Sequence, residues 1–238
     1  FRYATLAPFS CYPLKFMLLS LQSMEILMTE SDNTDYEFFH WGPLVCHYKT
    51  PLGLSENITT LGRKRKENDY RADLAGHLDH EYGFNKDDHD LFVKWYGKYF
   101  DSYAEAYKER FGTAHGGMEL TSLWINFMKA GDFNPPHMHT QHVSFVLFTS
   151  DTSGLDDEVA AWKGTGPAPG DLILTYGEHS YKYSPPWTII NHNRHPKKGD
   201  LYIFPALLKH WVAPFKSDFE RVSVSGNLKF REMVSDPF

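Results

Sequence analysis

The chain has 238 residues, of which 42% are hydrophobic and 16% aromatic, so it can bury a sizeable core, and this composition argues against intrinsic disorder. Thirty acidic against twenty-four basic residues give a net charge of −6, so we expect no nucleic-acid partner, because nucleic-acid binders are normally basic. No apolar run reaches the roughly 18 residues that a membrane-spanning helix needs, so no membrane partner is expected, and the two cysteines, Cys11 and Cys46, fit a reducing, cytoplasmic compartment.

The first 23 residues differ from the chain that follows. They carry a short apolar piece, Phe16-Met17-Leu18-Leu19, but no initiator Met. This pattern is typical either of a leader or of upstream sequence foreign to the domain, with the natural start at Met24 or Met28. We expect residues 24–238 to form a single domain, irregular and helical over 24–117 and a β core over 118–230.

The next part of the chain shows little periodicity. Residues 36–60 predict irregular chain with short extended pieces around Leu44-Val45-Cys46. A basic run follows, Gly62-Arg63-Lys64-Arg65-Lys66, which is flanked by Glu67 and Asp69. Such a run could contact phosphate, but flanking acids are more typical of a solvated loop, which is the interpretation we adopt.

The clearest helix is predicted over residues 87–111. Asn85, Asp87 and Asp88 are candidate N-caps, and Gly112 stands where a helix of this length is expected to end. Apolar residues recur at steps of three and four and form one face: Phe92, Trp95, Tyr96, Tyr99, Phe100, Tyr103, Ala106 and Tyr107. We interpret this aromatic stripe as core packing rather than as a ligand platform.

After Gly117 the hydrophobic period changes from about 3.6 to 2. Leu123, Ile125 and Phe127 alternate with polar or large residues, and further short apolar runs follow, separated by Gly, Pro, Asn and Asp. The predicted strands are 123–128, 143–148, 172–174, 187–190, 201–204 and 222–228. Many short strands divided by turn signals predict a mainly β fold, a sandwich or barrel, behind N-terminal helices.

Histidine is unusually frequent, with thirteen in the chain and seven of them from His137 to His210. His137 and His139 follow the strand-entry pair Pro135-Pro136, and residues two apart in extended chain point to the same face. His210 lies just past a predicted strand and can supply a third nitrogen, whereas His142 would point to the opposite face. We therefore predict a metal site of His137, His139 and His210 with positions left open. The alternative is loop histidines bonded to the backbone.

A possible anion site follows eleven residues after His210. Arg221 and Ser223 share one face of a predicted strand. A buried guanidinium is costly unless it meets an anion, and its fork fits a carboxylate, to which a hydroxyl can also donate. The alternative is a structural salt bridge at an exposed β edge.

Taken together, the motifs resemble those of one known family. The first half of the pattern comprises Trp124-x-Asn126, Gly131-Asp132, Pro136-His137-x-His139 and Ser144. The second half comprises Gly199-Asp200-Leu201-Tyr202-Ile203-Phe204-Pro205, His210, Pro214-Phe215 and Arg221-x-Ser223. From about Leu120 to Asn227 the chain resembles the Fe(II)/2-oxoglutarate-dependent dioxygenase superfamily, closest to a poorly characterised phage and bacterial branch distantly related to prolyl hydroxylases. The segment from Asp73 to Asp79 is similar to the N-terminal half of that branch. The resemblance implies a double-stranded β-helix, or jelly roll.

The resemblance also implies cofactors and roles for single residues. Fe(II) is the implied metal and 2-oxoglutarate the cosubstrate. His137 matches the first iron ligand and His210 the distal one. Arg221, supported by Ser223, matches the group that grips the far carboxylate of 2-oxoglutarate, and Asn126 lies on a strand that lines the cosubstrate pocket in such folds.

One position departs from the family pattern. The superfamily places a carboxylate two residues after the first histidine, whereas this chain has His139 there. If His139 ligates, the site holds three neutral imidazoles and carries one more positive charge, so iron as the native metal becomes an open question. If it does not, a coordination position stays open. Like Asn126, Ser144 lies on a strand next to the cosubstrate pocket in such folds, and we interpret it as a core-packing residue.

The implied reaction is O₂-dependent hydroxylation of an unidentified substrate, a peptide or a small metabolite, with release of succinate and CO₂. No catalytic residue beyond the metal ligands is expected. Aromatic and polar residues in 177–197, together with the preceding Tyr176, form a candidate rim: Tyr176, Tyr181, Tyr183, Trp187, Asn191 and Arg194. Two alternatives stay open: a non-redox, cupin-like metal- or ligand-binding jelly roll, and a three-His zinc hydrolase.

Overall fold

The computed structural model describes residues 42–112, 116–176 and 191–231. The leader expected over 1–23, the strand expected over 187–190 and most of the candidate rim lie outside the described residues. In chain order the described elements are β1 (Cys46–Lys49), α1 (Leu52–Gly62), the 3-10 helix η1 (Arg71–Asp73), β2 (Glu81–Gly83), α2 (Lys86–Phe111), β3 (Met118–Met128), β4 (Asn134–His137), β5 (Val143–Phe148), the 3-10 helix η2 (Ser153–Leu155), α3 (Asp156–Ala161), β6 (Leu172–Thr175), β7 (Asn191–Arg194), β8 (Asp200–Pro205), β9 (Lys209–Val212) and β10 (Arg221–Phe230).

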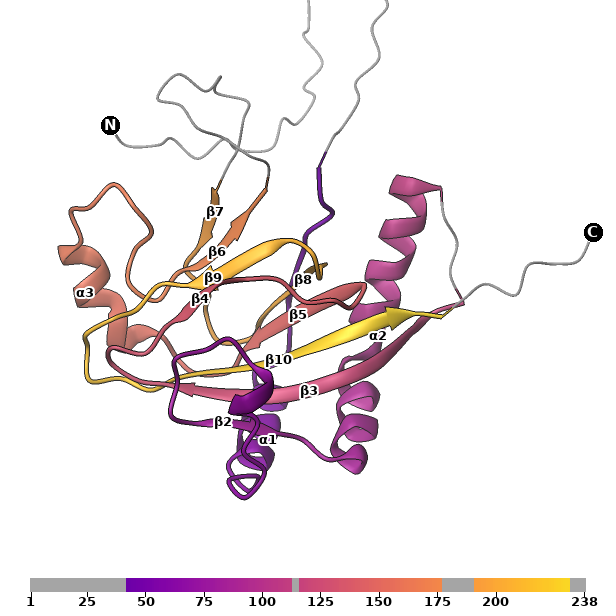
Figure 1. The fold of residues 1–238 in the computed structure, drawn as a ribbon, viewed down its shortest axis with the longest axis horizontal. Coiled ribbons are helices and arrows are strands. Elements are labelled where there is room, and N and C mark those ends of the chain that lie inside the picture. The colour runs from indigo at the N-terminus through magenta and orange to yellow at the C-terminus, as the bar shows by residue number, and fades with distance from the viewer. Residues whose placement is uncertain (1–41, 113–115, 177–190, 232–238) are drawn as a thin grey trace, which may run out of the picture. The chain divides into compact units, whose positions relative to one another are not determined.

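The described strands form two sheets, and every pairing within them is antiparallel (Figure 1). The larger sheet has six strands in the order β1-β8-β5-β10-β3-β2, and the smaller has four in the order β4-β9-β6-β7. The sequence-based expectation of a mainly β fold with a few helices is therefore confirmed. The short strands β2, β4 and β9 were not predicted.

Helix α2 confirms the strongest helix prediction. Its first turn is closed by a capping box: the Asp88 backbone N–H donates to Asn85 Oδ1 at 2.9 Å, and the Asn85 backbone N–H donates to Asp88 Oδ2 at 3.0 Å. Gly112 ends the helix in the left-handed conformation, with φ of 68°. No helix within the described ranges is long and apolar enough to cross a membrane.

The aromatic face of α2 packs into the core, as predicted. Its buried members are Phe92, Tyr96, Phe100 and Tyr103. The Phe92 and Phe100 rings stand 5.4 and 5.2 Å from the ring of Phe145 on β5. This face and α1 cover one side of the six-stranded sheet and share a core with its apolar residues.

The expectation of irregular chain over 36–60 is wrong for its second half, because Leu52–Gly62 form α1. The apolar pattern of this segment is short, with Leu54, Ile58 and Leu61 at helical spacing, and packing of these residues against the core supports the helix. Ile58 is fully buried, and Gly62 lies so close to β3 that a Cβ there would stand 2.5 Å from Ile125 Cδ1. Only glycine allows this approach of helix to sheet.

The two arginines of the basic run after α1 pair with acids of the same chain. Arg65 holds Asp88 with two hydrogen bonds, of 2.7 and 2.8 Å, and Arg63 forms an ion pair with Glu220. The Arg65 contact ties the end of α1 to the start of α2.

The six-stranded sheet has a second face, which looks toward the smaller sheet. Residues of both sheets share a core there, among them Met128, Phe148 and Tyr202 of the larger sheet and Leu172, Leu174 and Val212 of the smaller. Directly opposed residues in antiparallel strands point to the same side. The register sets Phe148, Ser223, Asn126 and Glu81 side by side across β5, β10, β3 and β2, and so places three polar residues in a row beside Phe148 on this face.

Candidate metal centre and cosubstrate pocket

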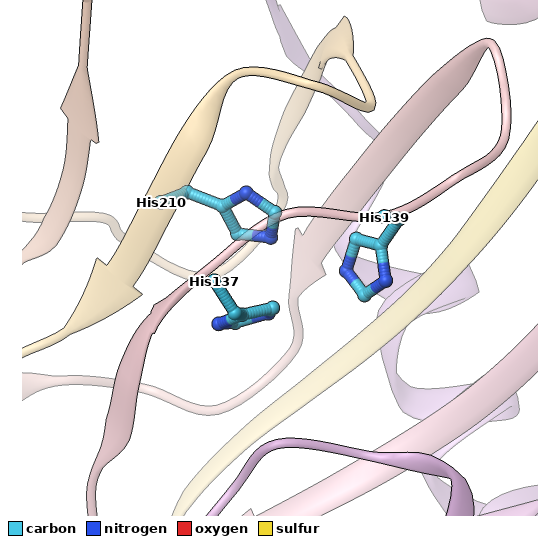
Figure 2. Close-up of side chains that lie close together, drawn as sticks. All are labelled: His137, His139 and His210. Carbon is cyan, nitrogen blue, oxygen red and sulfur yellow. The ribbon is translucent and has the colours of Figure 1, made fainter.

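The three predicted histidines lie together (Figure 2). His137 ends β4, His139 follows two residues later, and His210 lies on β9 directly opposite His137 in the β4–β9 pairing. The ring of His137 is 4.3 Å from that of His210 and 5.0 Å from that of His139, and one nitrogen of each residue lies within 4.8 Å of the others. This spacing suits one shared divalent ion.

Backbone contacts fix the tautomers of two rings. His137 Nδ1 lies 2.7 Å from the Pro135 carbonyl oxygen, and His210 Nδ1 lies 2.8 Å from that of Leu208. A carbonyl oxygen only accepts, so each Nδ1 carries the proton and donates it, which leaves the Nε2 lone pair for a metal. The backbone N–H of His139 donates to the Ala206 carbonyl at 2.9 Å and holds its loop against the turn before β9.

All three imidazoles are held neutral. Burial, with the nearby His137, lowers the pKa of His210 to about 3 and that of His139 to about 4. Burial also lowers the pKa of His137. Only the neutral ring can bind a metal, so the site is in the ligating state at neutral pH.

No Asp or Glu of the described ranges joins this cluster, so the departure at position 139 is also a feature of the structure. The nearby His142 has another role, as expected: its Nδ1 accepts the Phe230 backbone N–H at 3.0 Å. The candidate ligands that the described residues bring together are therefore three imidazoles.

Arg221, on β10, is 2% exposed. Its guanidinium carbon lies 4.5 Å from the centre of the Phe148 ring, and Nη1 lies 3.7 Å from the sulfur of Met128. Nε and Nη2 have no hydrogen-bond partner. Burial lowers the pKa of Arg221 to about 9, against the opposing effect of Asp171, because a charge without an anion is disfavoured in the interior. The alternative interpretation of Arg221, a structural salt bridge at an exposed β edge, is therefore not observed.

The remaining candidates line the same cavity as Arg221 and the three histidines. Asn126 Nδ2 donates to Ser223 Oγ at 3.4 Å and to Ser225 Oγ at 3.3 Å. Ser144 also lines the cavity, but its hydroxyl is engaged, donating to Asn227 Oδ1 at 2.6 Å. The structure thus brings together the six residues predicted to bind the metal and the cosubstrate: His137, His139, His210, Arg221, Ser223 and Asn126.

Among the described cavity residues that sequence reasoning missed, Glu81 is the one carboxylate. It is 1% exposed, and its Oε2 has no hydrogen-bond partner. Burial, against the opposing effect of Arg71 and with smaller contributions from Asp132 and Asp69, raises the pKa of Glu81 to about 7. β2 is only three residues long and carries no readable pattern, so only its pairing with β3 reveals where Glu81 lies.

Residues 122–227, from β3 to β10, match the model of a family described as "Putative 2OG-Fe(II) oxygenase". The resemblance to the Fe(II)/2-oxoglutarate-dependent dioxygenases is confirmed. The matched segment contains all three histidines and both Arg221 and Ser223. No curated protein sequence matches the chain.

Solved structures of 2OG-Fe(II) oxygenases share the fold. A prolyl-4-hydroxylase from Pseudomonas putida is 16% identical, with a TM-score of 0.52 over 79% of this chain and 92% of its own. A viral collagen prolyl hydroxylase from Paramecium Bursaria Chlorella virus-1 is 9% identical, with a TM-score of 0.50 over 84% and 98%. A Trichoplax adhaerens prolyl hydroxylase, in complex with a hypoxia inducible factor peptide fragment, is 12% identical, with a TM-score of 0.50 over 79% and 83%.

The 2OG-Fe(II) oxygenase family implies Fe(II) and 2-oxoglutarate as cofactors. The residues present fit both. Three neutral imidazoles with nitrogens within 4.8 Å of one another suit a divalent ion. The unpartnered nitrogens of Arg221 are the donors that a buried carboxylate needs.

Proposed function

We propose that the chain is an Fe(II)- and 2-oxoglutarate-dependent oxygenase that hydroxylates a peptide or a small metabolite and releases succinate and CO₂. The observation that carries this proposal is the buried Arg221, whose Nε and Nη2 lack partners in the same cavity as the three histidines. His137, His139 and His210 hold the metal. Arg221 and Ser223 hold the far carboxylate of 2-oxoglutarate, and Asn126 positions Ser223.

The bound metal and cosubstrate supply the oxidising chemistry, and the protein supplies placement. An unpaired guanidinium costs several kcal/mol to bury, and a diacid that offers a carboxylate offsets this cost. A cupin-like binder or a zinc hydrolase with the same three ligands would leave the Arg221 charge without a partner. These alternatives therefore explain less of the cavity.

The proposal extends to the fold and the substrate class. Two antiparallel sheets that share a core are what a jelly roll requires, so we infer a double-stranded β-helix for the part of the predicted domain that the structure describes. The Trichoplax enzyme of similar fold was solved with a peptide, which supports a peptide as one substrate class.

The test is anaerobic titration of the protein with Fe(II) and then 2-oxoglutarate, followed by visible absorption. We expect a charge-transfer band, and succinate release once O₂ is admitted. Arg221→Ala should bind metal as before and lose at least about tenfold in 2-oxoglutarate affinity, since a charge-assisted pair is lost. The matched control is Lys229→Ala, which removes an exposed cation from the same strand. Undiminished 2-oxoglutarate turnover in Arg221→Ala would defeat the assignment.

A further inference from the structure

Unpartnered buried polar atoms gather in one place. Among the described residues eight such atoms occur, and four of them line the cavity beside the histidines: Glu81 Oε2, Asn126 Oδ1, and Arg221 Nε and Nη2. Two of the four are donors and two are acceptors. Buried polar groups without partners are rare in folded proteins, so a group of them points to a ligand.

The cosubstrate accounts for the donors only. Both ends of 2-oxoglutarate are carboxylates, which accept hydrogen bonds and would be repelled by the carboxylate of Glu81. Asn126 already uses its amide N–H groups on Ser223 and Ser225, which leaves Oδ1 as an acceptor. Glu81 and Asn126 face each other in the β2–β3 register, so the two free acceptors are neighbours on one side of the cavity.

The fold leaves room for the Glu81 carboxyl by means of a glycine. A Cβ at Gly76 would stand 2.7 Å from Glu81 Oε1 and 2.5 Å from Asn134 Oδ1. Leu74 and Ala75, which precede Gly76, also line the cavity. Leu74, Ala75 and Gly76 therefore lie against the carboxyl, in keeping with the 1% exposure of Glu81.

We propose that Glu81 and Asn126 form the substrate-binding end of the cavity, and that they bind a cationic N–H group of the substrate, an ammonium or a guanidinium. This inference rests on the proposed function, because it assigns Arg221 to the cosubstrate. A cation that donates to both acceptors favours the ionised form of Glu81 and pairs its charge, whereas a neutral hydroxyl or amide would leave a buried carboxylate uncompensated. Glu81 is thus a specificity-determining residue.

The test uses two probes of closely similar shape, one cationic and one neutral. The protein is loaded with Zn(II) and 2-oxoglutarate, and dissociation constants are measured by ligand-observed NMR for n-butylguanidinium and for its neutral analogue n-butylurea. We expect the cation to bind at least about tenfold more tightly, as a charge-assisted hydrogen bond predicts. Glu81→Gln, which keeps the shape and removes the charge, should abolish the preference, whereas Glu119→Gln, an exposed change on β3, should keep it.

The outcomes separate this inference from the function on which it rests. Binding of 2-oxoglutarate is measured first in the same samples, including Glu81→Gln, where unchanged binding also shows that the variant folds. If 2-oxoglutarate binds but the wild-type protein does not prefer the cation, or Glu81→Gln keeps the preference, the substrate assignment is wrong and the oxygenase proposal stands. If 2-oxoglutarate does not bind the wild-type protein, both fall.

Discussion

At the residue scale, His139 decides the charge of the proposed metal centre. It stands where a carboxylate is usual, yet its ring lies 5.0 and 5.1 Å from those of His137 and His210. We expect His139→Ala to weaken Co(II) binding by more than about 100-fold, beyond the effect of losing an outer-shell partner. Titration followed by visible absorption measures this loss. His142→Ala, three residues on, should bind like the wild type. Equal affinity in His139→Ala would show that two histidines suffice.

Glu81 makes a prediction about pH. Its pKa rises from 4.5 in the unfolded chain to about 7 in the fold, because burial disfavours the charged form. Below pH 4.5, Glu81 is neutral in both the folded and the unfolded protein, so its burial costs no charge. As the pH rises from 4.5 to about 7, the unfolded chain ionises Glu81 while the fold keeps it neutral, so the free energy of unfolding falls. In the metal-free protein, the advantage of Glu81→Gln in unfolding free energy should therefore grow by roughly 1.4 kcal/mol per pH unit over this range and then level off.

Urea unfolding at a series of pH values measures this difference. The imidazoles nearby titrate in both proteins and largely cancel in the comparison. Of the charged neighbours of Glu81, Asp69 and Asp132 add to the effect and Arg71 reduces it. A difference that does not change with pH would show that Glu81 is ionised throughout.

Site residues were predictable from the sequence where they lie in extended chain, because every second side chain there points to the same face. His137 and His139, and likewise Arg221 and Ser223, are two apart in extended chain, so their shared face can be read directly. Glu81 could not be found in this way. It reaches the cavity through the pairing of β2 with β3, which joins segments about 45 residues apart that share no local pattern.

At the scale of elements, the capping box of α2 is the clearest local determinant of the fold. Asn85→Ala removes the acceptor of the Asp88 N–H and should lower the free energy of unfolding by about 1 kcal/mol. Urea denaturation followed by circular dichroism measures the loss. Lys94→Ala, at an exposed position inside the same helix, should change stability by less than about 0.5 kcal/mol. A similar effect of both substitutions would show that the cap contributes nothing.

Elements with a strong internal period were predictable, and those formed by packing were not. α2 and β5 match their predicted ranges closely, because each presents one continuous apolar pattern. α1 is a helix since Ile58 and Gly62 fit against the sheet, a reason that only the assembled fold contains. β4 and β9 are four residues each, too short for periodicity to mark them.

At the scale of the whole molecule, the proposed site lowers the stability of the ligand-free protein. Arg221 is buried without an anion, so Arg221→Met, of similar length and uncharged, should stabilise the metal-free protein by roughly 1 kcal/mol or more. In the wild type, metal and 2-oxoglutarate at about 100 times their dissociation constants should add about 2.7 kcal/mol each.

Thermal unfolding with and without the two ligands measures both effects. Arg221→Met should keep the stabilisation by metal and lose that by 2-oxoglutarate. Lys229→Ala should behave as the wild type in both measurements. A destabilised Arg221→Met protein without ligands would show that packing of the guanidinium on Phe148 outweighs its missing charge partner.

The direct pairing of His137 with His210 across β4 and β9 has a consequence for the assembly of the enzyme. His137 and His210 become neighbours only when β4 and β9 pair in their final register, since a shift of one residue would turn one ring to the other face of the sheet. Under the proposed function, a chain with a misaligned smaller sheet offers iron only the local pair His137 and His139. The complete set of three ligands therefore forms only in molecules that have finished folding.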